Sequence, residues 1–118
     1  MAIRNVTMRN LLATSYKTNA PYGALFSADP GTADAATNEL SGGGYARQAA
    51  NWGTAASSAI TSGSMAFSVA SAATVAYFGV ATSSVATTAD VKDSVAVTSQ
   101  TFASAGTYTI TSATFTVT

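Results

Sequence analysis

The chain has no cysteine and no histidine, and its 118 residues include only five basic and five acidic side chains. Without cysteine there can be no disulfide framework and no metal–thiolate site. Without histidine the commonest general base and metal ligand is missing. The net charge of zero argues against a nucleic-acid binder, which needs a basic excess to neutralise phosphates. We therefore expect no metal, no cofactor and no nucleic-acid partner.

Charge is also absent from two long blocks, residues 48–89 and 94–118, which are rich in Ala, Ser and Thr. Disordered chains combine low hydrophobicity with high net charge, whereas this one is 47% hydrophobic and neutral. These blocks are better explained as strands of a sheet whose exposed faces carry neutral Ser and Thr side chains. Freely dispersed proteins usually carry net charge, so neutrality favours a protein held in an assembly.

Long apolar runs are lacking as well. Residues 11–13 are too few for a secretory h-region. The run at 72–81 falls short of the about 18 residues that a membrane helix needs. We expect no membrane partner and, from the length, one domain spanning residues 1–118.

An amphipathic helix is predicted over residues 7–18, capped by Asn5 or Thr7 and ended before Pro21. Met8, Leu11, Leu12, Ser15 and Tyr16 recur at the i, i+3, i+4, i+7, i+8 spacing of one helical face.

After Pro21 the apolar residues recur at every second position, a spacing that predicts strands. We expect a central strand at 74–81, which is apolar on both faces, and a final strand with a bulge near residues 111–112, where the apolar parity changes. The fold class is mainly β: an antiparallel β-sandwich (jelly-roll-like, residues 22–118) with one N-terminal α-helical segment (residues 1–20). The predicted strands are 22–27, 45–52, 58–62, 64–70, 74–81, 91–98 and 107–117.

Three consecutive glycines, Gly42, Gly43 and Gly44, predict a tight turn in which at least one residue has φ > 0. A phosphate-binding loop would need Gly-Lys-Ser/Thr opening a helix, which is not the pattern here. Glu39 and Arg47 flank the turn, and we expect them to form a salt bridge that closes this loop or one with a neighbouring subunit.

Two other patterns each have a catalytic or binding interpretation and a structural one. The loop acids Asp29, Asp34 and Glu39 could serve a glycosidase, which needs two carboxylates, or could solvate the loop and cap turns. No partner divides acid from base roles among them, so we expect no enzyme. Trp52 and Tyr45 could stack on a sugar, but an aromatic near a strand end is typical of a sandwich core.

Asp29-Pro30-Gly31 is followed, after a short polar spacer, by Asn-Glu-Leu-Ser-Gly-Gly-Gly-Tyr-Ala-Arg at residues 38–47. This pattern resembles a family of small tailed-phage virion proteins, whose members are capsid decoration, head-fibre, minor tail or tail-fibre proteins. The similarity extends from about Tyr22 to residue 118. Residues 75–80 resemble the family's central strand, with Tyr77 where histidine is common. Residues 99–108 resemble its closing hairpin, in which a glycine precedes the last strand.

This resemblance implies a non-enzymatic structural protein of a tailed bacteriophage virion, assembled in the host cytoplasm. We expect a capsid decoration protein that docks on the major capsid lattice. The alternatives are a minor tail or tail-fibre protein, partnered by tail proteins, and a carbohydrate-binding module that contacts the host surface. A homo-oligomer is expected, with a trimer favoured.

The N-terminal segment carries Arg4, Arg9 and Lys17, and no acid precedes Asp29. It is therefore the candidate assembly contact with an acidic patch on a partner. The alternative is that the helix covers one open end of the sandwich through Met8, Leu11, Leu12 and Tyr16.

Overall fold

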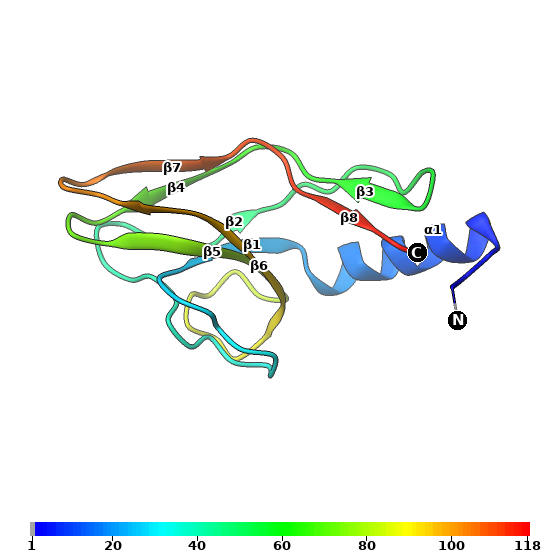
Figure 1. Ribbon diagram of the computed structural model, residues 1–118, viewed down its shortest axis with the longest axis horizontal. Coiled ribbons are helices and arrows are strands. Elements are labelled where there is room, and N and C mark those ends of the chain that lie inside the picture. The colour runs from blue at the N-terminus through cyan, green and yellow to red at the C-terminus, as the bar shows by residue number, and fades with distance from the viewer. Residues whose placement is uncertain (1) are drawn as a thin grey trace.

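The computed structural model describes residues 2–118, which form one helix followed by antiparallel strands (Figure 1). The mainly β class predicted from the sequence is confirmed. Its elements are α1 (Val6–Asn19), β1 (Tyr22–Phe26), β2 (Gln48–Ala49), β3 (Ala59–Thr61), β4 (Met65–Val69), β5 (Thr74–Ala81), β6 (Val91–Thr101), β7 (Gly106–Ile110) and β8 (Thr114–Thr116).

The strands lie in two layers. One is a four-stranded sheet with the order β2-β1-β5-β6, and the other is a ribbon in which β3 pairs with β8 and β4 pairs with β7. The layers meet closely at Gly23 of β1, where an added Cβ would lie 2.6 Å from the Met65 sulfur of β4. A glycine is needed there because any side chain would push the layers apart.

The core between the layers is built from aliphatic and aromatic side chains of the strands. Its largest fully buried members are Phe67, Leu25, Ile60, Met65, Val69 and Val75, while Phe26 is buried in a separate cluster with Ala24, Ala81 and Val91. Trp52 also belongs to the core, since it is only 8% exposed and its indole Nε1 donates to the Ala20 carbonyl at 2.8 Å. This placement excludes Trp52 as an exposed sugar platform.

The predicted central strand is present with the expected bounds. β5 lies between β1 and β6 and is hydrogen-bonded to both. By contrast, the strand predicted at 45–52 is wrong in extent, because only β2 pairs with β1 there. Asn51 has φ 51°, a left-handed conformation that ends an extended strand.

The predicted bulge near residues 111–112 is wrong. Ile60 pairs with Phe115 and Met65 pairs with Ile110, so five positions separate the two pairs on each strand. A bulge would place an extra residue on one strand only. Instead, on both strands the buried and half-buried positions change between even and odd residue numbers at the same level of the ribbon. This change divides the ribbon into β3–β8 and β4–β7 while the register is kept.

The closing hairpin implied by the resemblance is also absent. β6 pairs with β5 and β7 pairs with β4, so these consecutive strands lie in different layers. Residues 102–105 therefore cross from the sheet to the ribbon rather than turning back within one sheet.

The helix begins and ends close to the predicted residues, and the Asn5 side chain caps it by accepting from the Met8 N–H at 3.1 Å. Figure 1 places α1 at one end of the molecule, beneath β3 and β8. The expected apolar cover is wrong in its residues, because Met8, Leu11 and Leu12 are 48%, 59% and 42% exposed. Within residues 2–118, no helix has the length and apolar character to cross a bilayer.

Tyr16 alone of the four expected side chains packs on the strands. Its ring stacks on Phe115 with centroids 3.7 Å apart and meets Trp52 edge-on. Ala13, one turn earlier, is fully buried. The helix therefore attaches to the end of the sandwich through a narrow stripe.

Candidate functional site

The densest polar site surrounds Arg47, whose guanidinium is fully enclosed. All five of its N–H donors have an acceptor. Nε and Nη2 bond the two Glu39 carboxylate oxygens at 3.0 and 2.9 Å. Nη1 bonds Asp90 Oδ1 at 2.7 Å and the Ser83 carbonyl at 3.1 Å, and Nη2 also reaches the Thr88 carbonyl at 2.9 Å. No donor is left for a ligand.

Glu39 is saturated in the same way. Besides Arg47, its oxygens accept from the Tyr45 hydroxyl and the Thr87 N–H, both at 2.8 Å. The Tyr45 oxygen in turn accepts from the backbone N–H of Leu25 in β1 at 3.0 Å. The network therefore extends from a loop carboxylate to the central sheet.

Asp90 completes what we call the Arg47 cluster: Arg47, Glu39, Tyr45 and Asp90. Its second oxygen accepts from the Ser83 N–H at 2.8 Å. The Arg47 and Glu39 side chains have no exposed surface, whereas the Asp90 side chain is 17% exposed. Enclosure of this kind costs desolvation, which only complete hydrogen bonding offsets.

The pKa values of the cluster residues depend on the balance between burial and hydrogen bonding. Burial on its own raises the pKa of Asp90, but hydrogen bonds from Arg47 and Ser83 outweigh it and leave this pKa lowered. For Arg47, burial lowers the pKa, and bonds to Glu39 and Asp90 overcome that effect and raise it. Burial, helped by the Glu39 carboxylate, raises the pKa of Tyr45. Asp90 and Arg47 thus stay charged, and Tyr45 stays neutral, near neutral pH.

The glycine turn leads into this cluster. Gly42, Gly43 and Gly44 have φ of 78°, 63° and 82°, all in the left-handed region. The Tyr45 N–H donates to the Gly42 carbonyl at 3.1 Å, which closes the turn. At Gly43 an added Cβ would lie 2.6 Å from the Ala70 Cα. The turn therefore aims Tyr45 and Arg47 inward while packing directly on the loop after β4.

The three loop acids have three different partners. Asp29 accepts from the Gly31 N–H at 2.8 Å in an Asx turn, and Asp34 pairs with Lys92 at 2.6 Å on the surface. Glu39 is enclosed in the Arg47 cluster. Along residues 2–118, no group of three His, Cys, Asp or Glu side chains could hold a metal ion.

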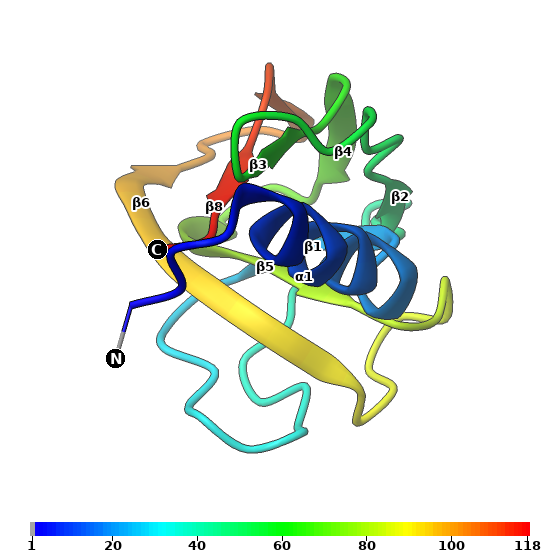
Figure 2. The ribbon, with the colours of Figure 1, turned by 90° about the vertical axis from the view of Figure 1, so that its right-hand side faces the viewer.

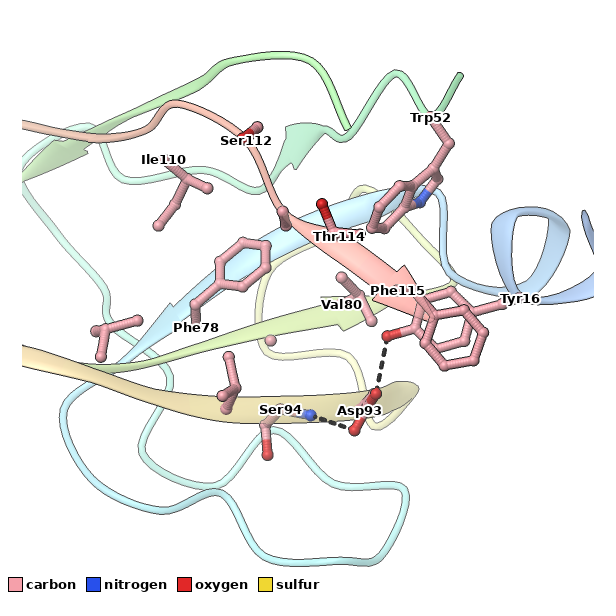
Figure 3. Close-up of a pocket in the computed structure, with 14 residues that line it drawn as sticks. Tyr16, Trp52, Phe78, Val80, Asp93, Ser94, Ile110, Ser112, Thr114 and Phe115 are labelled. Carbon is pink, nitrogen blue, oxygen red and sulfur yellow. Dashed lines mark hydrogen bonds between the residues drawn. The ribbon is translucent and has the colours of Figure 1, made fainter. Parts of the chain in front are cut away.

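A cavity of about 300 Å³ lies along the open side of the sandwich, between β6 and the ribbon strands β7 and β8 (Figure 3). Its walls are largely apolar, and Tyr16 and Phe115 stack at one end. The Tyr16 hydroxyl donates to Asp93 Oδ2 at 2.8 Å, as the dashed line in Figure 3 marks. The carboxylate at this cavity is therefore already bonded within the chain.

The structure does not bring Arg4, Arg9 and Lys17 onto one open surface. Arg9 Nε donates to Ser58 Oγ at 2.6 Å, and another Arg9 nitrogen donates to the Ile3 carbonyl. Lys17 Nζ reaches the Gly53 carbonyl at 3.4 Å. Arg4 is exposed ahead of the helix. Two of the three basic side chains therefore contact their own domain.

Sequence reasoning missed Asp90, the second carboxylate of the cluster. Asp90 is 43 positions from Arg47, so no local spacing links them. The one available signal was composition, because an acid standing at the end of the long uncharged block 48–89 needs a reason to be there.

The model of one protein family, described as Podophage GP4 fiber I protein gp80, matches residues 1–118. The chain belongs to this family. It is thus a bacteriophage structural protein related to fibre proteins. No curated protein and no solved structure matches it.

Proposed function

We propose that the protein is a non-enzymatic component of a fibre on the phage tail, and that it acts in the assembled virion together with tail proteins. The observation that carries this proposal is the family match over the whole chain, to a protein described as a fiber. It favours the tail-fibre alternative over decoration of the major capsid lattice, which nothing in the family description mentions.

The arrangement of charged groups supports a structural role. Arg47, Glu39 and Asp90 are joined in one enclosed network, and Asp34 pairs with Lys92. The carboxylates that a glycosidase would need are thereby engaged in a turn, a surface pair and a buried cluster. A hydrolytic site needs one acid free to donate and one free to attack.

The carbohydrate-binding alternative loses its two aromatic candidates. Trp52 lies in the core, and the Tyr45 hydroxyl is bonded to both Leu25 and Glu39. A sugar platform needs an open aromatic face with free polar groups beside it, which neither residue provides.

Location is tested by counting copies. Quantitative mass spectrometry of purified particles should find a handful of copies per particle and should recover the protein with detached tails. Hundreds of copies that remain with tail-free capsids would instead establish decoration and overturn the fibre proposal.

The absence of catalysis is tested separately. Purified protein should release no sugar from host polysaccharide. Turnover that is lost in Asp29→Asn, Asp34→Asn or Glu39→Gln would show an enzyme.

A further inference from the structure

The two layers of the sandwich differ in width. The sheet has four strands, β2-β1-β5-β6, whereas the ribbon is two strands wide along its length. On the β2 side the layers are joined, because the Gly63 N–H donates to the Ala50 carbonyl at 2.9 Å. Figure 2 shows β2 and β4 on this side of the molecule and β6 and β8 on the other. Within residues 2–118, no backbone hydrogen bond joins β6 to β7 or β8, so this side of the sandwich is open.

The inner face of β6 is only partly covered by this chain. Val95 of β6 pairs with Phe78 of β5, and directly paired residues of antiparallel strands place their side chains on the same face of a sheet. Phe78 is buried in the core between the layers, at 5% exposed, so Val95 also faces toward the ribbon. Val95 is nevertheless 58% exposed. An apolar side chain that faces the interior and still meets solvent marks a position that the ribbon leaves uncovered.

The cavity of about 300 Å³ lies at the same uncovered position. Val95 lines it from the sheet and Ile110 from the ribbon. Among the lining residues in the described part of the chain, only Asp93 is charged. Both of its oxygens already accept hydrogen bonds, from the Tyr16 hydroxyl and from the Ser94 N–H. The cavity therefore suits uncharged, apolar side chains that come from outside the chain.

The outer edge of β7 and β8 borders this cavity. We define it as the backbone of residues 106–116 on the side away from β4 and β3, where no strand of residues 2–118 pairs with it. Exposed edges normally carry charges, prolines or bulges that prevent the addition of another strand. Residues 94–118 contain neither a charge nor a proline, and β7 and β8 pair with β4 and β3 in continuous register. This edge is therefore open to a further strand.

The outer edge of β6, by contrast, is protected. The pairing of β6 with β5 has two register shifts, and Lys92 and Asp93 lie at one of them. Bulges and charges of this kind disfavour strand addition. The difference between the two edges directs an incoming strand to β7 and β8, where it lies over the inner face of β6.

We propose that the outer edge of β7 and β8 accepts an extended strand from a different protein of the virion, which becomes the third strand of the ribbon. Main-chain hydrogen bonds supply the affinity in strand addition, and alternate side chains supply the specificity. The inward side chains fill the cavity over Val95, so they are apolar. The outward ones continue an exposed row of hydroxyl side chains, so they are small and polar; the row consists of Thr107, Thr109, Thr114 and Thr116.

The occupant is thus an uncharged strand in which apolar and hydroxyl side chains alternate. Every strand within residues 2–118 is already paired, so a second copy of this chain has no free strand to insert beside β6. The proposal is the same whether the protein serves in a fibre or on a capsid.

The first test uses a synthetic peptide of alternating threonine and valine, with a lysine at each end for solubility. When added to the full chain, it should slow hydrogen–deuterium exchange in residues 106–116, because an added strand protects the N–H groups of the edge. The control peptide has proline in place of every second valine, which removes N–H groups that pairing needs, and it should leave exchange unchanged. If the first peptide gives no protection, or both give the same, the edge does not accept a strand.

A second test places a charge beneath the added strand. Val95→Lys should keep the circular dichroism spectrum of the parent, because this position is exposed in the free chain. It should abolish both the protection by the peptide and incorporation into particles, since an inward-pointing charge blocks strand addition. Val85→Lys is the matched control, because Val85 is 66% exposed in the loop between β5 and β6, and it should behave as the parent does.

Two results of this second test would overturn the proposal. One is a Val95→Lys chain that the peptide still protects, or that enters particles as the parent does. The other is a parent that dimerises without peptide and has residues 106–116 protected in the dimer. That result would show that a second copy, rather than a different protein, pairs with this edge.

Discussion

Arg47 Nη1 and Asp90 Oδ1 lie 2.7 Å apart, although 43 positions separate the two residues. The contact joins the loop that precedes β2 to the loop that connects β5 and β6. Glu39 holds the opposite side of the same guanidinium. In a chain with only ten charges, three are thus committed to one network that fixes two irregular loops against the sheet.

Replacing Arg47 by Met should strongly destabilise the fold, because it leaves the enclosed Glu39 carboxylate without its counter-ion. Breaking a buried pair from one side costs about 3–5 kcal/mol. Urea unfolding followed by circular dichroism measures this loss. The control is Lys92→Met, which removes the exposed pair with Asp34 and should cost about 0–1 kcal/mol. Similar losses for the two variants would mean that the cluster is not a stabilising element.

The cluster should also make stability depend on pH in the acidic range. Asp90 has a lowered pKa in the folded state, so its contribution is present above the ordinary aspartate pKa of about 3.9. That contribution is lost as the pH falls through the lower folded-state value. We expect Asp90→Asn to be less stable than the parent at pH 7, with a smaller loss on acidification below about pH 4.

The measurement is the free energy of unfolding at several pH values. Asp34→Asn, which alters an exposed carboxylate, is the control and should keep the parent's acid dependence. If the free energy of unfolding of Asp90→Asn falls with pH as steeply as that of the parent, Asp90 does not cause the acid dependence.

Adjacent glycines should differ in their tolerance of alanine. Gly42→Ala introduces a Cβ with nothing within 4 Å, so only its positive φ opposes the change, at about 1 kcal/mol. Gly43→Ala adds a collision with the Ala70 backbone at 2.6 Å. Gly43→Ala should therefore lower the unfolding midpoint well beyond Gly42→Ala. Equal midpoints would show that the turn does not pack on Ala70.

Removal of the Tyr45 hydroxyl should clearly lower the free energy of unfolding. Tyr45→Phe leaves the Leu25 N–H without its acceptor and removes a donor from Glu39. An unsatisfied buried group costs about 1–3 kcal/mol. Tyr108→Phe is the comparison, because within residues 2–118 that hydroxyl makes no hydrogen bond, and it should be nearly neutral in chemical denaturation. If the two changes cost the same, the hydroxyl does not link the cluster to β1.

The elements with a clear period were predictable from the sequence. The helix and β5 follow from the 3.6-residue spacing and from a run that is apolar on both faces. The glycine turn was predictable because three consecutive glycines disfavour helix and strand interiors and readily adopt positive φ. All three glycines do have positive φ.

The errors share one cause, which is that local pattern does not reveal strand partners. The parity change near residues 111–112 predicts a bulge only when the strand is taken without its partner. The same change on the partner strand, between Ile60 and Met65, removes the need for an extra residue. The cover of the sandwich that Met8, Leu11 and Leu12 were one alternative to provide is likewise made by other side chains of α1, Ala13 and Tyr16.

The stack of Tyr16 on Phe115 has a consequence for synthesis. The two residues are 99 positions apart, so the ribosome makes the helix well before the strand on which Tyr16 stacks. Domains generally form from the N-terminus as the chain emerges, but for this contact an early element must wait for a later one. Translation of β8, rather than local helix formation, should therefore time the closing of the stack between Tyr16 and Phe115.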